Sequence, residues 1–114
     1  MQKGPVRVVK SYQQDNLGYI VTLSITVERS VENLRVIDPL PSGGANPAVR
    51  RPTQTVTGLI NNQTVAVNWR LDGNTFVLGR LAAGVYTVQY GLFTDLAADA
   101  VVTVPDLLWD EISR

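Results

Sequence analysis

Hydrophobic and polar residues alternate with a period of two through much of this chain of 114 residues. The alternation is clearest in residues 18–28, GYIVTLSITVE, where the hydrophobic alternate positions are Tyr19, Val21, Leu23, Ile25 and Val27. Successive side chains of an extended strand point to opposite faces, so these residues would share one buried face. The other face would carry Ile20, Thr22, Ser24, Thr26 and Glu28. This segment predicts a half-buried β-strand.

Segments with the same character precede and follow this strand. The residues before it, PVRVVKSYQ at 5–13, and after it, VENLRVID at 31–38, predict two further strands. Later strands are predicted at 53–60, 64–71, 75–81, 85–93 and 99–104. In the strand at 64–71, one face would carry Val65, Val67, Trp69 and Leu71, and in the strand at 85–93 the inward residues would be Tyr86, Val88, Tyr90 and Leu92. Asp72-Gly73-Asn74 predicts a tight hairpin turn.

Seven to eight short strands with frequent turn signals, and no convincing helical period, are typical of an all-β fold. We therefore expect an antiparallel Greek-key β-sandwich, immunoglobulin-like, that forms a single domain over residues 1–114. The segment Pro39–Pro52 contains four prolines and two adjacent glycines, so it predicts a loop or a crossover between sheets.

The stretch LRVIDPLPSG, residues 34–43, ends a strand in two prolines. Pro39 and Pro41 lack an N–H and would end the hydrogen-bonded ladder, and Gly43 would supply positive φ values for the reversal of the chain. Asp38 has two interpretations, a catalytic acid at a strand end or a carboxylate that accepts bonds from the N–H groups of the following turn. The structural interpretation is favoured because no His, Cys or paired acid would serve as a catalytic partner, and Asp38→Ala would then cost about 0.5–2 kcal/mol.

Composition narrows the function classes. Ten Lys and Arg residues balance ten Asp and Glu residues, so no net charge attracts nucleic acid. The chain has no Cys and no His, which removes the commonest metal ligands and the commonest acid/base group, and we expect neither a cofactor nor enzyme activity. No apolar run reaches the roughly 20 residues that span a bilayer, so membrane insertion is not expected.

The order of three segments, YIVTLSITV, LRVIDPLPSG and VNWRLDGNTFVLGRLAAGVYTVQY, resembles the bacterial cell-surface conserved repeat domain, domain of unknown function number eleven. The matching positions are Tyr19 and Thr22, then Asp38, Leu40, Pro41 and Gly43, then Trp69, Leu81 and Gly84. The similarity covers residues 6–92, although Glu28-Arg29-Ser30 replaces the family's usual Asn-x-Gly turn. The terminal region of bacterial alpha-2-macroglobulins is similar over a comparable span.

The resemblance implies a non-enzymatic structural or protein-interaction module of a bacterial envelope or exported protein, a spacer or assembly unit. Its partners would be neighbouring domains or subunits, and its location extracytoplasmic. The alternative is a carbohydrate-binding module of a secreted or surface protein, which needs exposed aromatic residues. Of the tyrosines and tryptophans, only Tyr12 and Trp109 lie outside the predicted core faces, and Arg50-Arg51 would be a contact for an anionic glycan.

The resemblance fades beyond Phe93, and residues 106–114 predict a docking tail or linker. Its apolar residues, Leu107, Leu108, Trp109 and Ile112, would form a helical turn or a strap. The tail would either cover a sheet edge of its own domain or dock on a neighbour. Its acidic residues, Asp106, Asp110 and Glu111, are candidates for a calcium site but match no known loop. Asn62-Gln63-Thr64 fits the glycosylation sequon, with a polar turn as the other interpretation.

Overall fold

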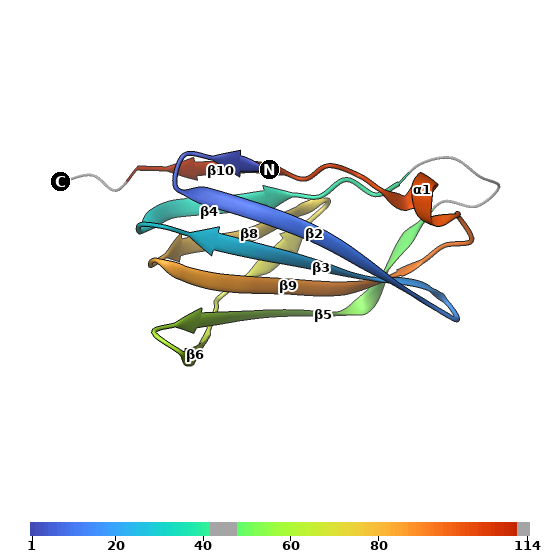
Figure 1. The fold of residues 1–114 in the computed structure, drawn as a ribbon, viewed down its shortest axis with the longest axis horizontal. Helices are drawn as coiled ribbons and strands as arrows, with labels where there is room; N and C mark the ends of the chain where they lie inside the picture. Colours follow the sequence, from blue (N-terminus) through green and yellow to red (C-terminus); the bar gives the residue numbers. More distant parts are fainter. Residues whose placement is uncertain (42–47, 112–114) are drawn as a thin grey trace.

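Two antiparallel sheets pack face to face in the computed structural model, which describes residues 1–41 and 48–111 (Figure 1). The six-stranded sheet has the order β1 (Gln2–Lys3), β2 (Val6–Asp15), β3 (Gly18–Val27), β9 (Gly84–Phe93), β5 (Val49–Ile60) and β6 (Gln63–Ala66). The four-stranded sheet has the order β10 (Asp106–Asp110), β4 (Val31–Ile37), β8 (Thr75–Leu81) and β7 (Arg70–Asp72). The prediction of an all-β sandwich is confirmed, with ten strands in the described residues in place of seven to eight.

The order of strands follows from repeated crossings between the sheets. β9 comes late in the chain yet lies between β3 and β5, and it is antiparallel to both. The chain therefore leaves the six-stranded sheet after β3, returns for β5 and β6, leaves again for β7 and β8, and returns for β9. These crossings place residues from distant segments side by side in the core.

The core consists of the inner faces that the alternation predicts. In β3 and β9, the predicted inward residues are all buried, and they are Tyr19, Val21, Leu23, Ile25, Val27, Tyr86, Val88, Tyr90 and Leu92. The facing sheet contributes Leu34, Val36, Phe76, Leu78 and Leu81. The rings of Phe76 and Tyr90 stack across the interface with their centroids 5.6 Å apart. Burial of these side chains supplies the main driving force for the sandwich.

The prediction of a single strand at residues 64–71 is wrong. Its first half forms β6 in one sheet, its second half forms β7 in the other, and residues 67–69 connect the two. The tight turn at Asn61 and Asn62, both at positive φ, returns the chain along β5 for only four residues. Trp69, expected in the core, is half-buried at the crossover with its ring tilted against Phe76 at 6.4 Å.

The loop expected at Pro39–Pro52 is too long, because β5 already begins at Val49, opposite Phe93 of β9. The pairing of β5 with β9 shifts register between Arg50 and Gln54, around Pro52. A β-bulge can hold a proline inside a strand because the extra residue leaves the ladder. The glycine at position 43 lies outside the described residues.

The prediction of a last strand at residues 99–104 is also wrong. Residues Ala98–Val101 form the short helix α1, and 102–105 run without sheet pairing to Pro105. Alanine favours a helix, and Asp99 in the first turn suits the positive end of the helix. Val101 of that turn is buried. The tail instead forms β10, which pairs with β4 at the edge of the four-stranded sheet, the strap arrangement.

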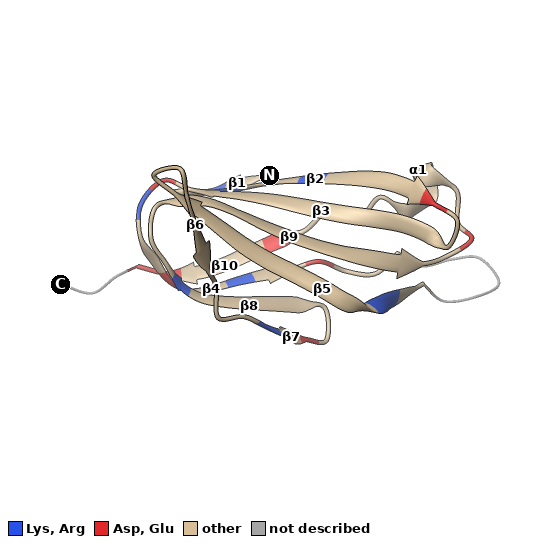
Figure 2. Cartoon of the chain, turned by 90° about the horizontal axis from the view of Figure 1, so that it is seen from below, with Lys and Arg blue, Asp and Glu red and all other residues tan. Residues whose placement is uncertain are grey.

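Charged residues lie mainly at strand ends and in connections (Figure 2). The two central strands of the six-stranded sheet, β3 and β9, contain no charged residue at all. The turn of Gly73 and Asn74 between β7 and β8 has the predicted hairpin form, with Gly73 at φ 61°. Within the described residues, no helix is long and apolar enough to cross a membrane.

Candidate functional site

Asp38 is the one charged residue of the described chain that is fully buried, with 0% exposure. It follows directly after β4, where its N–H donates to the carbonyl of Asn74 at 2.8 Å. A buried carboxylate is costly unless it is paired and hydrogen-bonded. The residues around Asp38 therefore form the candidate functional site.

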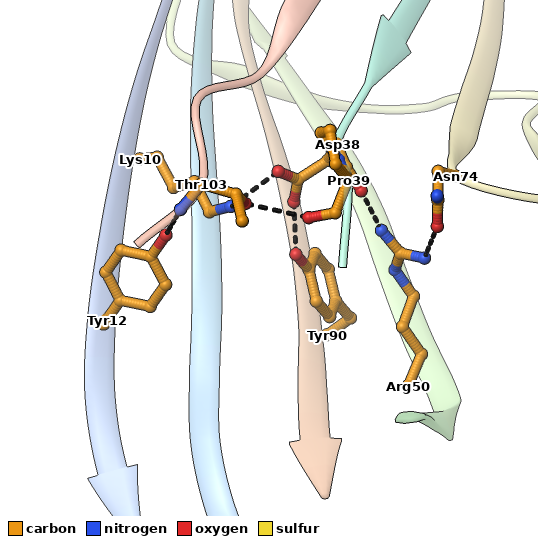
Figure 3. Close-up of polar contacts among 8 residues, drawn as sticks. All are labelled: Lys10, Tyr12, Asp38, Pro39, Arg50, Asn74, Tyr90 and Thr103. Atoms are coloured by element: carbon orange, nitrogen blue, oxygen red, sulfur yellow. Dashed lines mark hydrogen bonds and ion pairs between the residues drawn. The ribbon is translucent and has the colours of Figure 1, made fainter. Parts of the chain in front are cut away.

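Two side chains from the opposite sheet bind the carboxylate of Asp38 (Figure 3). The Nζ of Lys10 in β2 lies 2.6 Å from Oδ1, and the Lys10 side chain is only 7% exposed. The hydroxyl of Tyr90 in β9 donates to Oδ2. Burial, together with the negative charge of Asp38, raises the pKa of Tyr90 far above its ordinary value, which keeps the hydroxyl protonated as a donor.

Thr103 joins this cluster to the connection that leads to β10. Its hydroxyl accepts a bond from Lys10 at 2.6 Å and donates to the carbonyl of Pro39 at 2.8 Å. Its backbone N–H donates to the hydroxyl of Tyr12 at 3.1 Å. The cluster therefore ties both sheets and the segment before the tail to one point.

Arg50 closes the other side of the cluster. One guanidinium nitrogen donates to the backbone carbonyl of Asp38 and the other to the side chain of Asn74 at 2.8 Å. The guanidinium also lies over the rings of Tyr90 and Phe76, with distances of 4.9 and 5.5 Å to the ring centroids. Arg50 therefore holds the carbonyl at the end of β4 and packs against aromatic side chains of the core.

The sequence predicts other hydrogen-bond partners for the carboxylate of Asp38 than those that the structure shows. The expected acceptance of bonds from the following turn falls on residues 42–47, outside the described residues. Among the described residues, the carboxylate pairs with Lys10 and Tyr90, which the sequence reasoning missed. A signal was present, because Lys10 stands between Val8 and Tyr12 on the inward-facing positions of β2, and a charge on a buried face needs a partner.

The prolines of the predicted turn lie in different surroundings. Pro39 is exposed and its carbonyl accepts the bond from Thr103, while Pro41 is buried. β4 ends at Ile37, two residues before Pro39, and a proline lacks the N–H that would continue the ladder.

A second, more exposed ion pair links Arg51 to Asp15. The guanidinium bonds both carboxylate oxygens, at 2.6 and 2.7 Å, and also donates to the carbonyl of Leu92 at 3.1 Å. Asp15 accepts the N–H groups of Leu17 and Gly18 at 2.9 Å each, which closes the β2–β3 turn. The bonds from Arg51 and the turn lower the pKa of Asp15 from its usual 3.8 to about 2.

A shallow groove lies beside this ion pair on the outer face of the six-stranded sheet. Its volume is about 390 Å³, and its lining includes Ile20, Arg51, Gln89, Gly91 and Phe93. The guanidinium of Arg51 lies over the exposed ring of Phe93, 5.3 Å from its centroid. The groove is apolar with an amide and a guanidinium at its rim.

The tail residues lie along the edge of the four-stranded sheet. Leu107 is 1% exposed, Leu108 points outward and is 39% exposed, and half-buried Trp109 packs against Gly4 beneath the guanidinium of Arg29. The isoleucine at position 112 lies outside the described residues. In the described monomer the tail thus covers an edge of its own domain.

The three acidic residues of the tail engage separate partners. Asp106 pairs with Lys3 at 2.7 Å, Asp110 accepts from Asn33 at 3.2 Å, and Glu111 forms a two-bonded pair with Arg29. In residues 1–41 and 48–111, no group of three or more acidic, His or Cys side chains is arranged to hold a metal ion. Their geometry is that of individual clamps on the tail.

Comparison of the chain with models of protein families, with curated proteins and with solved structures finds no match.

Proposed function

We propose that this chain is a non-enzymatic structural module, a spacer or assembly unit, of a bacterial cell-envelope or exported protein. The observation that carries the proposal is the arrangement at Asp38. Its carboxylate, the ammonium of Lys10 and the hydroxyl of Tyr90 satisfy one another in the interior. Groups bound in this way cross-link segments and are not poised to meet a substrate.

The shape and the bracing of the sandwich suit a spacer. The principal extents are 51 × 24 × 21 Å, so the domain is elongated along its strands. The cluster around Asp38 and the pair of Arg51 with Asp15 tie strands, turns and the segment before β10 together. The motif resemblance to bacterial cell-surface repeats supports an extracytoplasmic location, with neighbouring domains or subunits as partners.

Rigidity is the testable property of a spacer. The chain contains no cysteine, so Leu17→Cys and Ala83→Cys would place two unique spin labels at opposite ends of the β3–β9 ladder. We expect a single narrow distance distribution by electron paramagnetic resonance, unchanged when the domain is fused between two other folded domains. A broad or multiple distribution would contradict the spacer role.

The proposed location has a separate test. Immunoblotting of fractionated cells of the source organism should find the protein in the envelope or the culture medium. Recovery in the cytoplasmic fraction alone would contradict an extracytoplasmic module, whatever the outcome of the distance measurement.

The groove beside Phe93 favours carbohydrate binding as a second candidate function. An exposed aromatic ring beside Gln89 and Thr55 offers a stacking surface with polar groups at its rim. Titration of ¹⁵N-labelled protein with cellohexaose, chitohexaose or mannohexaose should then shift the amides of Gln89 and Gly91, and Phe93→Ala should abolish the shifts. If none of the three sugars shifts these amides, the chain has no such function.

A further inference from the structure

The edge of the six-stranded sheet at β2 is largely without a neighbouring strand (Figure 1). The two-residue strand β1 pairs only with Val6 and Arg7, and Met1 extends the contact to Val8. Beyond Val8, β2 continues to Asp15 with β3 as its only neighbour among the described residues. More than half of this ten-residue strand is therefore an open edge.

The bonds of Val8 show which backbone groups lie on that edge. Its N–H donates to the carbonyl of Met1 at 2.9 Å, and its carbonyl accepts from the N-terminal amine at 3.0 Å. In an antiparallel ladder every second residue directs both groups to the same side. Lys10, Tyr12 and Gln14 therefore direct their N–H and C=O away from β3, and no described residue bonds these groups.

The other sheet edges carry features that discourage strand addition. β6 and β7 are only four and three residues long. The part of β5 that extends past β6 contains Pro52 and a register shift. β10 follows Pro105 and contains two acidic residues, and Lys3 donates to the carbonyl of Leu107. Short length, proline, bulges and charge are the usual protections of an exposed edge.

The open part of β2 lacks all of these protections. It contains no proline and no bulge, the side chain of Lys10 is turned into the core, and Asp15 is bound to Arg51. The outward positions carry exposed Val9, Ser11 and Gln13. This edge is uncharged toward solvent over several residues.

Exposed apolar side chains flank the same edge. Thr103 bonds to Lys10 and Tyr12, which places its neighbours beside β2. These neighbours, Val102 and Val104, are 60% and 73% exposed, and Val9 in β2 is 55% exposed. Apolar side chains beside unpaired backbone groups are what an added strand would cover.

We propose that β2 is a strand-addition edge whose occupant is a second copy of this chain. The two β2 strands pair antiparallel about a twofold axis at Tyr12, so that Lys10 lies opposite Gln14 of the second copy. All three unpaired residues of each copy then exchange backbone bonds, and the two six-stranded sheets join edge to edge. This inference names the partner for the assembly role proposed above and rests on it.

The register argues for a second copy because it is self-complementary. Tyr12 lies opposite Tyr12 of the second copy, Ser11 opposite its Gln13, and Val9 opposite its Asp15. No like charges therefore lie opposite one another. The side chain of Lys10, opposite Gln14, is already paired with Asp38 inside its own domain.

Sedimentation velocity over increasing concentration tests the proposal on the intact chain. We expect a reversible dimer at concentrations up to about 1 mM, with slower hydrogen exchange of the Lys10 and Tyr12 amides as it forms. Gln14→Pro removes an edge N–H without touching the β3 ladder, and Ser11→Lys adds an exposed charge to the edge. Each should weaken dimerisation by about tenfold or more, with an unchanged melting temperature.

Thr55→Lys is the matched control, because it adds the same charge to the same face of the sheet on β5. It should leave dimerisation unchanged. A chain that stays monomeric at about 1 mM, or a dimer that both edge variants leave intact, overturns the proposal. Concentration-dependent protection at β5 or β10 in place of β2 also overturns it. Diluting the spin-labelled chain with unlabelled chain removes distances between copies, so failure here and failure of the spacer role are distinguishable.

Discussion

Asp38 and Asp15 each pair with one basic residue, yet the two carboxylates differ in their burial and in their other hydrogen-bond partners. Asp38 is fully buried and bonded to Lys10 and Tyr90 from the opposite sheet. Asp15 lies at a surface turn and is bonded by Arg51 and by the turn's own N–H groups. The same carboxylate chemistry therefore braces the core in one region and clamps a turn in the other.

The free energy lost when an ion pair is broken therefore depends on the surroundings of the partner that remains. Removing Asp38 leaves an ammonium and a hydroxyl in the interior, where water cannot replace the lost partner. Removing Asp15 leaves the guanidinium of Arg51, whose side chain is 15% exposed and keeps its bond to the carbonyl of Leu92, so a smaller loss is expected.

Asp38→Ala should lower the free energy of unfolding by about 3–5 kcal/mol, because Lys10 and Tyr90 lose their buried partner. This exceeds the roughly 0.5–2 kcal/mol expected from the sequence for a turn cap. Urea denaturation measures the difference, with Asp15→Ala as the control of smaller effect. Equal losses for the two variants would contradict the contrast between the regions.

Tyr90→Phe should cost about 1–3 kcal/mol, because Asp38 keeps Lys10 but loses the hydroxyl that bonds its second oxygen. Tyr86→Phe is a matched control, since the Tyr86 hydroxyl bonds a single backbone carbonyl, that of Ala82, at 2.7 Å. Thermal or urea unfolding of both variants gives the comparison. A smaller loss for Tyr90→Phe than for Tyr86→Phe would show that the cluster is not the stronger brace.

The pH dependence of the Asp15 pair should be visible only in strong acid. Its folded pKa of about 2 lies below the usual 3.8, so its stabilisation is present above about pH 4 and is lost as the pH falls through about 2. Arg51→Gln should move the carboxyl titration of Asp15, followed by NMR, upward toward 3.8. A titration that Arg51→Gln leaves unmoved would remove Arg51 as the main cause of the lowered pKa.

The smallest effect should come from the clamp of the tail. Arg29 and Glu111 are both more than half exposed, so their pair is screened by salt. Glu111→Gln should leave the melting temperature nearly unchanged while speeding hydrogen exchange in β10. A large global destabilisation would mean that this clamp, rather than the burial of Leu107, holds the tail in place.

The sequence predicts the parts of this fold that depend on local alternation. The inward residues from Tyr19 to Val27 and from Tyr86 to Leu92 are buried as their period indicates, because the inner face of each strand is apolar throughout. The splitting of 64–71 between two sheets and the pairing of the tail as β10 depend on contacts between distant segments, which a local pattern does not contain.

The site illustrates the same limit. The position of Asp38 before Pro39 indicates a special residue at a strand end, but its partners come from residues 28 and 52 positions away in the chain. Lys10 on an inward-facing position of β2 gave a usable signal of a buried charge. That Tyr90 bonds Asp38 and that Thr103 bonds Lys10 depend on the order of strands in the two sheets, which a local pattern does not contain.

Native-state hydrogen exchange of Tyr90→Phe and Arg51→Gln tests most directly that the Asp38 cluster braces the whole sandwich. For Tyr90→Phe, the account predicts an equal fall in the opening free energy of the slowest amides in β3, β4 and β9, because the cluster joins both sheets. For Arg51→Gln, it predicts faster exchange confined to the β2–β3 turn and the end of β9. Faster exchange confined to Ile37–Pro41 in Tyr90→Phe would contradict the account.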